Sequence, residues 1–198
     1  MVNLYYSYIP ESIDEGLINS LSEYRQIGLK NKKQSLTRTQ AIASELLLEK
    51  AASQYYKRPL PITQNIHGKP YFEDNKLHFN ISHSGDMVAC ATAFSEIGLD
   101  VQEIKPYNLK FAQRFYCDEE IEYINQAEDK NIAFTEIWCK KESYLKAKGL
   151  GLRIELNSFS VLSPEMHFRF GRIDTYCYCI CLPDYMISEL NIEEIKLL

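Results

Sequence analysis

The chain has 198 residues, of which 45% are hydrophobic and 25% charged, and its formal net charge is −5 at pH 7. These proportions are typical of a globular protein with a sizeable core, and no run approaches the ~20 apolar residues of a transmembrane helix. The negative net charge argues against nonspecific binding of nucleic acid. Because the N-terminal MVNLYYSYIP lacks a basic segment followed by an apolar stretch, we expect no secretory signal and a cytoplasmic protein.

Three of the six cysteines, Cys177, Cys179 and Cys181, alternate in one run near the C-terminus. Without an export signal, we expect reduced thiols rather than disulfides. Cysteines on one face of a strand could hold a metal ion, but no C-x-x-C pair or nearby histidine completes such a site. The aromatic and aliphatic residues between them instead predict a buried strand.

The first predicted elements are a strand and two helices. Loose alternation predicts a strand over residues 2–9. Ser12 and Glu15 have the spacing of a capping box, and the apolar stripe that follows predicts a helix over residues 13–24. A second, longer helix is predicted over residues 36–55.

Basic side chains lie between and at the start of these helices: Lys30, Lys32, Lys33 and Arg38. One interpretation is a solvated, positively charged connection. The other is a phosphate-binding segment, because anions favour helix N-termini as well as ammonium groups. The pattern of residues leaves both interpretations open.

The middle of the chain predicts three short antiparallel strands, over residues 77–81, 87–94 and 97–101. Because side chains alternate along a strand, Asp100 and Gln102 project from one face, two residues apart. Such a pair can supply oxygen ligands to a metal ion. In an arbitrary chain, a solvated polar face is the more common explanation.

Pro106 is the expected join between an N-terminal half, residues 1–105, and a C-terminal half, residues 106–198. After Pro106, the sequence predicts several helices. The last of them carries the densest group of polar residues. Three further strands are predicted, and the acidic C-terminal tail is expected to be peripheral. The strands are expected over residues 158–162, 167–170 and 175–182.

A helix is predicted from Phe134 to the glycines Gly149 and Gly151, because its apolar residues recur at helical spacing. Trp138, Glu142 and Lys146 follow one another at intervals of four, so they lie on one strip of this helix beside Lys141. Taken alone, Glu142 and Lys146 form an ordinary helical ion pair worth roughly 0.2–0.5 kcal/mol.

The complete pattern of this helix resembles the W-x-x-K-E-S-x-x-K-A-x-G-x-G-L signature of the surfactin-type 4'-phosphopantetheinyl transferases. Its matching residues are Trp138, Lys141, Glu142, Ser143, Lys146, Ala147, Gly149, Gly151 and Leu152. Earlier segments resemble further blocks of that family in the same order: Gly68 to Pro70, FNISHS over 79–84, and GLDVQ over 98–102. RFYCDEE over 114–120 is similar to a fourth block, with Glu120 at its acidic position.

The resemblance implies an α+β fold with two pseudo-symmetric halves, each a small antiparallel sheet with packed helices, in a single compact unit. It also implies Mg²⁺-dependent transfer of 4'-phosphopantetheine from coenzyme A to a serine of an apo acyl or peptidyl carrier protein. The second product is adenosine 3',5'-bisphosphate. Carriers of fatty acid, polyketide and nonribosomal peptide synthesis are the implied partners, and a monomer is expected.

Attack on a pyrophosphate concentrates negative charge, so the reaction needs a metal ion, cationic side chains and a proton acceptor. The resemblance assigns the metal to Asp100, Gln102 and Glu142. It assigns phosphate contacts to His83 and Lys146, with Ser82 and Lys69 as lesser hydrogen-bonding candidates. Lys141 is expected to neutralise nearby charge, Pro70 to help bind coenzyme A, and Arg38 to help hold its 3'-phosphate. The catalytic set is Asp100, Glu142 and Lys146.

Two assignments stay open within this set. Gln102 replaces a glutamate that is frequent in the family, so it is expected to coordinate through its amide oxygen or through a bridging water. Mn²⁺ is a second candidate for the metal. Proton removal is expected from Glu142, from a water molecule, or with help from Glu120.

Other functions fit the residues less well. A serine hydrolase at Ser82 or Ser84 with His83 lacks a G-x-S-x-G turn, and adjacent strand residues point to opposite faces. A zinc site at His78 and His83 is also disfavoured, because strand residues five positions apart point to opposite faces. The alternative from another class is a noncatalytic coenzyme A binding or carrier-protein docking module on the same scaffold.

Overall fold

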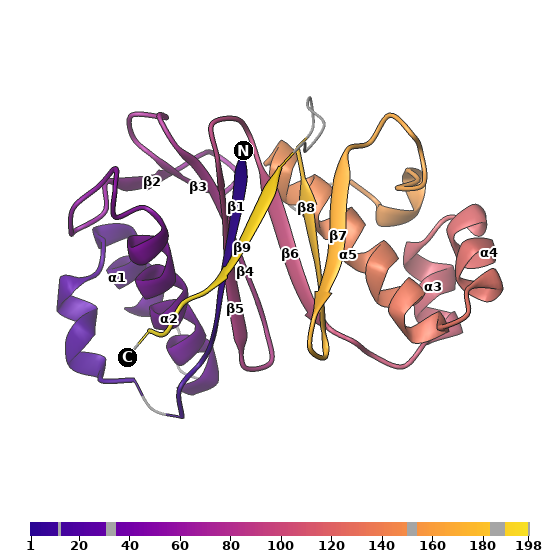
Figure 1. The fold of residues 1–198 in the computed structure, drawn as a ribbon, viewed down its shortest axis with the longest axis horizontal. Coiled ribbons are helices and arrows are strands. Elements are labelled where there is room, and N and C mark those ends of the chain that lie inside the picture. The colour runs from indigo at the N-terminus through magenta and orange to yellow at the C-terminus, as the bar shows by residue number, and fades with distance from the viewer. Residues whose placement is uncertain (12, 31–34, 150–153, 183–188, 198) are drawn as a thin grey trace.

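Two sheets lie against each other in the centre of the computed structural model, and helices cover their outer sides (Figure 1). The structure describes residues 1–11, 13–30, 35–149, 154–182 and 189–197. The α+β class expected from the sequence is confirmed. Within the described ranges, we find no helix with the length and apolar character needed to cross a membrane.

The first sheet has the strand order β4–β5–β1–β9. Its strands are β1 (Val2–Tyr8), β4 (His78–Ser84), β5 (Met87–Ala93) and β9 (Leu190–Glu194). β4, β5 and β1 are antiparallel neighbours, whereas β9 runs parallel to β1. The C-terminal tail, expected to be peripheral, thus pairs as the edge strand of this sheet.

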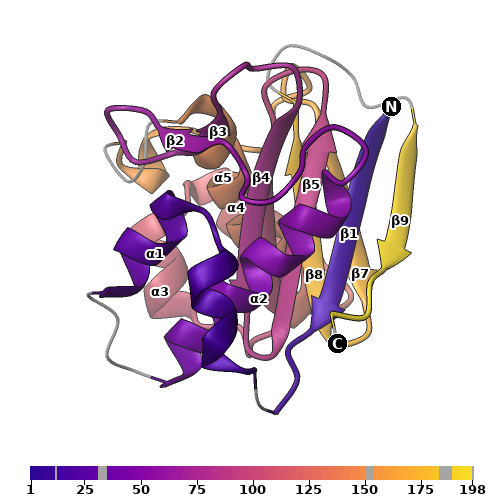
Figure 2. The ribbon, with the colours of Figure 1, turned by 90° about the vertical axis from the view of Figure 1, so that its left-hand side faces the viewer.

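Helices α1 (Glu23–Lys30) and α2 (Ser35–Ala51) pack on the outer side of the first sheet (Figure 2). The long helix α2 confirms the prediction for that segment. The shorter predicted helix is instead a 3-10 helix, η1 (Glu15–Ser20), followed by α1. The break lies at Ser22, whose backbone N–H and hydroxyl both donate to the buried Glu45 carboxylate. Ser12 lies outside the described residues.

The second sheet has the order β6–β8–β7 and is antiparallel throughout. Its strands are β6 (Gly98–Glu103), β7 (Phe168–Ile173) and β8 (Tyr176–Cys181). Helix α5 (Lys130–Lys148) packs on its outer side, next to α3 (Leu109–Phe115) and α4 (Asp118–Gln126). The small hairpin of β2 (Ile62–Gln64) and β3 (Pro70–Phe72) stands apart from both sheets in its pairing.

Strand β6 corrects the expected three-stranded sheet, because it pairs with β8 and not with β5. The sheets therefore do not follow the expected division at Pro106. β6 precedes that point yet belongs with the C-terminal strands, and β9 follows it yet pairs with β1. Residues 98–101 are buried, so β6 needs cover on two faces, which α5 and the opposite sheet supply.

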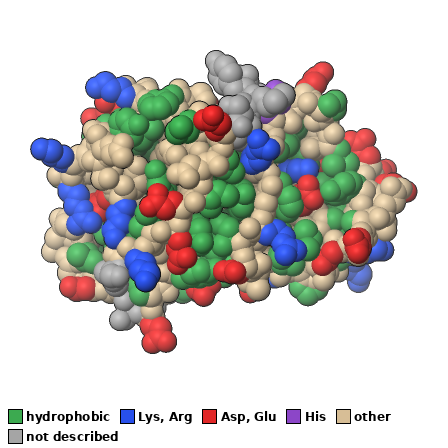
Figure 3. Space-filling model, in the orientation of Figure 1, with side chains coloured by type: hydrophobic (Ala, Val, Ile, Leu, Met, Phe, Trp, Pro, Cys, Tyr) green, Lys and Arg blue, Asp and Glu red, His purple; other side chains and the backbone are tan. Residues whose placement is uncertain are grey.

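The core between the sheets is apolar from both sides, with Leu4 and Ala91 from the first sheet and Leu99 and Ile180 from the second. The predicted buried strand at the cysteine run is confirmed as β8, all of whose residues are buried. All six cysteines lie in the described part of the chain, and none of them is in a disulfide. Hydrophobic side chains also gather on the surface over the middle of the molecule (Figure 3).

Polar side chains of β4 join the two sheets at the edge of β6, in what we call the side-chain ladder. Asn80 Oδ1 accepts the backbone N–H of Leu99 at 2.9 Å, and Ser82 Oγ accepts that of Val101 at 3.1 Å. Ser84 Oγ accepts the N–H of Glu103 at 3.1 Å. Each outward N–H in this stretch of the edge strand is therefore satisfied by a side chain of the other sheet.

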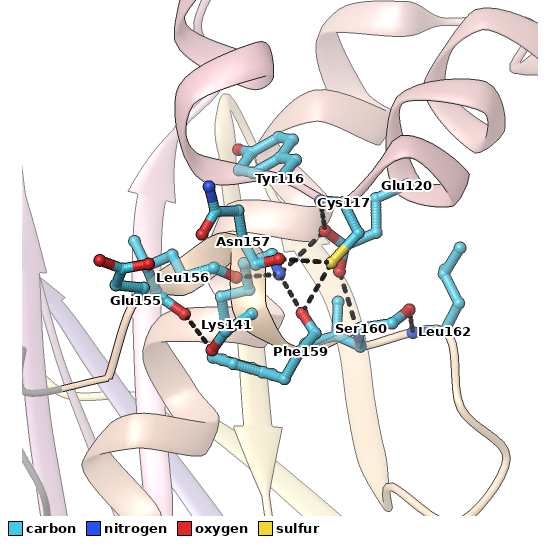
Figure 4. Close-up of polar contacts among 12 residues, drawn as sticks. Tyr116, Cys117, Glu120, Lys141, Glu155, Leu156, Asn157, Phe159, Ser160 and Leu162 are labelled. Atoms are coloured by element: carbon cyan, nitrogen blue, oxygen red, sulfur yellow. Dashed lines mark hydrogen bonds and ion pairs between the residues drawn. The ribbon is translucent and has the colours of Figure 1, made fainter.

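A buried charge in α5 fixes the loop that follows the helix (Figure 4). Lys141 and Glu120 have fully buried side chains, and Lys141 Nζ lies 2.8 Å from Glu120 Oε2. The ammonium also donates to the carbonyl oxygens of Leu156 and Phe159, each at 2.7 Å. The lysine therefore has an acceptor for each of its three N–H bonds.

The Glu120 carboxylate is satisfied in the same way. It accepts the backbone N–H of Cys117 at 2.8 Å and that of Val161 at 2.9 Å. These contacts hold the described residues 154–161 as a loop with one 3-10 turn, η2 (Leu156–Ser158), so the strand expected over 158–162 is wrong. Charged side chains bind the backbone there in place of a neighbouring strand.

Two expected roles are corrected by this cluster. Lys141 was expected to contact phosphate, and Glu120 was a candidate helper in proton removal. Both are fully buried and paired with each other, because the loop carbonyls and the α4 terminus enclose them. Neither side chain is available to a ligand.

Lys141→Met is expected to lower the free energy of unfolding by about 3–5 kcal/mol, because Glu120 would remain as a buried charge without its cation. Urea unfolding at neutral pH measures this change. Lys148→Met, at an exposed position of the same helix, is the control and should change stability by less than about 0.5 kcal/mol. Adding Glu120→Gln to Lys141→Met should restore part of the loss. Equal stabilities of the two single variants would contradict the role of the pair.

Candidate active site

The site begins where β6 and α5 come into close contact at Gly98. A Cβ atom added there would lie 1.9 Å from the Ser143 carbonyl oxygen and 2.4 Å from the Ala147 backbone nitrogen. Only glycine allows this approach of strand and helix. Asp100, the next residue on the same face of β6, is thereby brought against α5, as the alternation of side chains predicts.

Asp100 lies in a compact hydrogen-bonded group with Ser82 and Lys146. Lys146 Nζ is 2.6 Å from Asp100 Oδ1, which also accepts the Ser82 hydroxyl at 2.9 Å. Lys146 also donates to Ser82 Oγ at 3.0 Å. Ser82 thus joins the site to the side-chain ladder, since the same oxygen accepts the N–H of Val101.

The second oxygen of Asp100 has a different environment. Asp100 is only 5% exposed, and its Oδ2 is buried without a hydrogen-bond partner among the described residues. A buried carboxylate oxygen without a partner is costly, so its presence points to a missing cation or donor.

Glu142 supplies a second carboxylate from α5. Burial raises its pKa above the ordinary value, the negative charge of Asp100 raises it further, and Lys146 opposes both effects. The electrostatic coupling means that Asp100 and Glu142 lie near enough to repel each other in the absence of a cation. That the strand carboxylate and the helix carboxylate share one metal ion stays a prediction.

The metal ion implied by the sequence resemblance can be tested against these residues. The described residues contain no group of three or more His, Cys, Asp or Glu side chains arranged to hold a metal. Mg²⁺, however, usually takes one or two protein carboxylates and completes its shell with water and phosphate oxygens. Two carboxylates fit that kind of site: Asp100, whose buried Oδ2 has no partner among the described residues, and Glu142, whose pKa is raised by the charge of Asp100.

A cavity of about 320 Å³ opens beside Glu142 and Lys146, and we call it the Lys69 cavity. Its polar walls combine two ammonium groups, one carboxylate and one imidazole. The lining residues are His67, Gly68, Lys69, Pro70, Asn80, Ile81, Glu142, Leu145, Lys146 and Gly149. Two lysines in one small cavity favour an anionic ligand.

The predicted phosphate contacts divide between this cavity and other places. Lys69 and Pro70 line the cavity, and Ser82 lies just behind it through its bond to Lys146. His83 is exposed on β4, next to Ser82 and so on the opposite face. Arg38 donates to the Leu29 carbonyl at 3.0 Å. Neither His83 nor Arg38 lines the Lys69 cavity.

The basic segment after the first helix and the glycine-rich end of the helix signature are only partly described by the structure. Lys30 is exposed at the end of α1, whereas Lys32 and Lys33 lie outside the described residues. The same holds for Gly151 and Leu152, the last residues of the helix signature. Gly149 is described, and it ends α5 as predicted; its φ of 65° is left-handed, a conformation common for glycine at helix ends.

A second cavity of about 380 Å³, the Trp138 cavity, was not predicted from the sequence. Its lining residues are Gln102, Lys105, Pro106, Asn108, Phe111, Phe134, Thr135 and Trp138. Gln102 therefore borders a different cavity from Glu142, although both were predicted to hold one metal. Trp138, four residues before Glu142, was the available signal, but an aromatic residue on a helix face more often indicates core.

Comparisons with known proteins agree with this geometry. Residues 96–182 match the family model of the 4'-phosphopantetheinyl transferase superfamily. The chain is 33% identical to the 4'-phosphopantetheinyl transferase gsp of Aneurinibacillus migulanus over 171 residues, which are 80% of this chain and 70% of that protein. It is 34% identical to the 4'-phosphopantetheinyl transferase Sfp of Bacillus subtilis over 126 residues, 61% of this chain and 56% of Sfp.

A third relative extends over more of its own length. The 4'-phosphopantetheinyl transferase AcpT of Salmonella typhimurium is 29% identical over 160 residues, 76% of this chain and 79% of that protein. The chain thus spans little more than half of Sfp but more than two thirds of the other two relatives. The chain belongs to the 4'-phosphopantetheinyl transferase superfamily.

Proposed function

We propose that this protein transfers the 4'-phosphopantetheine group of coenzyme A to a serine of an apo carrier protein and releases adenosine 3',5'-bisphosphate. One observation carries the proposal: buried Asp100 binds Lys146 through Oδ1, keeps Oδ2 without a partner among the described residues, and acts electrostatically on Glu142. Lys146 and Glu142 both line a cavity that holds a second lysine. This combination suits a diphosphate and a divalent cation together, and the family of the chain supports it.

In the proposed reaction, the diphosphate of coenzyme A lies in the Lys69 cavity. The ammonium groups of Lys69 and Lys146 stabilise phosphate charge and the departing bisphosphate. Asp100 and Glu142 hold Mg²⁺, with Mn²⁺ as a second candidate. Bound there, the ion supplies neutralisation of phosphate oxygens and orientation of the diphosphate.

The carrier serine approaches, in this proposal, from the side of the Trp138 cavity. Gly98 lies two residues before Asp100 on β6 and contacts α5 at Ala147. Gln102 lies two residues after Asp100 and lines the Trp138 cavity. Asp100 therefore lies between the two cavities. In this proposal Gln102 faces the acceptor side, and its neutral amide adds no repulsion toward the diphosphate.

Proton removal falls to Glu142 or to a water molecule near it. Glu142 can take the proton only through an oxygen that the metal leaves free, because a carboxylate fully engaged by Mg²⁺ is a poor base. Glu120 is no longer a candidate, since it is buried in the ion pair with Lys141.

The alternative is a noncatalytic module that binds coenzyme A or docks a carrier protein. Lysines alone would serve such binding. Asp100 and Glu142 add negative charge beside an anion site and raise the cost of the unliganded state, because one buried oxygen lacks a partner. This arrangement favours the enzyme, which we expect to act as a cytoplasmic monomer.

The transfer itself is tested by intact-mass analysis of apo acyl and peptidyl carrier proteins after incubation with the protein, Mg²⁺ and coenzyme A. The expected result is the mass increment of one phosphopantetheine group, absent when a chelator replaces Mg²⁺. Binding of coenzyme A by the wild-type protein without any carrier modification, across carriers of several pathways, would favour the noncatalytic alternative.

Glu142→Gln and Asp100→Ala are each expected to lower the transfer rate by at least ~100-fold, since each removes a main electrostatic element of the site. Glu128→Gln is a matched control, because Glu128 is exposed just before the start of α5, far along the helix from Glu142. Rates come from the same mass analysis, and circular dichroism verifies folding. A variant of either carboxylate with near-normal turnover would remove its assignment to the metal.

The metal-free protein is expected to lose stability as the pH rises through the raised pKa of Glu142. Glu142 has a pKa near 4.5 in the unfolded chain, whereas folded Glu142 keeps its proton to a higher pH. The free energy of unfolding therefore falls as the pH rises from about 4.5 through the raised pKa. Glu142→Gln removes the titration. With EDTA present, the variant should be the more stable protein near pH 8, and the difference should shrink toward about pH 4.5. Thermal unfolding across this range measures it, and a constant difference would contradict the pKa shift.

A further inference from the structure

Lys69 has no N–H left for a ligand in this structure. Its ammonium donates to Glu96 Oε2 at 2.6 Å, to the Ala147 carbonyl at 2.9 Å and to the Ile97 carbonyl at 3.3 Å. An ammonium group has three N–H bonds. An anion that enters the Lys69 cavity must therefore displace one of these acceptors to bind Lys69.

The three acceptors differ in how easily they can leave. The Ile97 and Ala147 carbonyls belong to the backbone at the start of β6 and the end of α5, which pack tightly at Gly98. Glu96 has a side chain that is 56% exposed, and its Oε1 lies 3.5 Å from His78 Nδ1. A displaced Glu96 carboxylate would keep water and His78 as neighbours, so it is the acceptor that exchanges.

The backbone and stem of Lys69 are held while this exchange takes place. Asn65 Oδ1 accepts the backbone N–H groups of His67 and Lys69, at 2.8 and 2.9 Å. The Lys69 side chain is 14% exposed and lies against Gly149, where an added Cβ would be 3.3 Å from Lys69 Cδ. The ammonium therefore stays at the cavity wall and changes its partner without a large movement.

We infer that Glu96 sets the affinity of the Lys69 cavity for anions by competing with them for the Lys69 ammonium. The ligand class is a diphosphate, and this inference rests on the proposed function, in which the diphosphate belongs to coenzyme A. Glu96 acts through Lys69 and touches no reacting atom, so it is a residue that tunes affinity. A simple structural role for Glu96 predicts the opposite effect, because loss of the contact would then misplace Lys69.

The test is the substitution Glu96→Gln, which keeps the size of the side chain and removes its charge. Isothermal titration with coenzyme A and with inorganic pyrophosphate should give dissociation constants about twofold to fivefold lower than wild type, as expected for loss of a half-exposed ion pair. The gain should decrease as salt is added, since the competing charge is exposed. In turnover assays, KM for coenzyme A should fall by the same factor while kcat stays within about twofold.

Two further variants make the result specific. Glu128→Gln removes the same charge beyond the far end of α5 and should leave both dissociation constants unchanged. In a Lys69→Ala background, Glu96→Gln should have no effect on affinity, because its target is gone. Unchanged or weaker binding by Glu96→Gln, or an equal gain without Lys69, overturns the inference.

The outcomes for the two proposals can be told apart. Wild-type protein that binds coenzyme A and pyrophosphate but modifies no carrier overturns the proposed transfer and leaves the competition by Glu96 measurable. Wild-type protein that modifies carriers, with Glu96→Gln no tighter in binding, overturns the competition alone. Wild-type protein that binds neither ligand overturns both.

Discussion

The side-chain ladder between β4 and β6 is the constraint on which the rest of the molecule depends. β6 is an edge strand, and its N–H groups at Leu99, Val101 and Glu103 would otherwise face the first sheet without partners. Because these N–H groups belong to every second residue of β6 and bind every second residue of β4, they fix the register of β6 against β4. A slip by one residue would turn Asp100 into the apolar core between the sheets and Leu99 toward α5.

The same ladder links the structure to the chemistry through Ser82. Its hydroxyl has one proton and two acceptor positions, and all three are used, by Asp100, Lys146 and the Val101 N–H. The orientation of Asp100 is therefore set by a residue that also holds the sheets together. This explains how a site assembled from β4, β6 and α5 can leave one carboxylate oxygen unpartnered without collapsing around it.

The sequence predicted the local part of this arrangement well. Alternation on a strand and a four-residue interval on a helix were sufficient to place Asp100, Glu142 and Lys146 on the correct faces. The strand pairing was not predictable in the same way, because β6 carries apolar residues on one face and Gly98 and Asp100 on the other, which suits either sheet. What decides its place is contact with α5, more than forty residues later in the chain.

Lys141 shows a second limit of prediction. It is adjacent to Glu142 and stands in the same signature, so the sequence favours a common role. One residue corresponds to about 100° around a helix, however, and this rotation carries Lys141 away from the cavity and toward the loop behind α5. Its partners are two loop carbonyls and Glu120 on another helix, and neither propensity nor spacing indicates a loop that turns its carbonyls inward.

The two lysines of the Lys69 cavity differ in the carboxylates that hold them. Lys146 is paired with Asp100, which is buried and already has one oxygen without a partner, so removing the ammonium would leave a buried charge uncompensated. Lys69 is paired with Glu96, which water can solvate. An anion can therefore take Lys69 at low cost, whereas it can share Lys146 only if another positive charge replaces that lysine at Asp100. If the site holds a diphosphate and a metal ion as proposed, this difference makes the binding of each depend on the other.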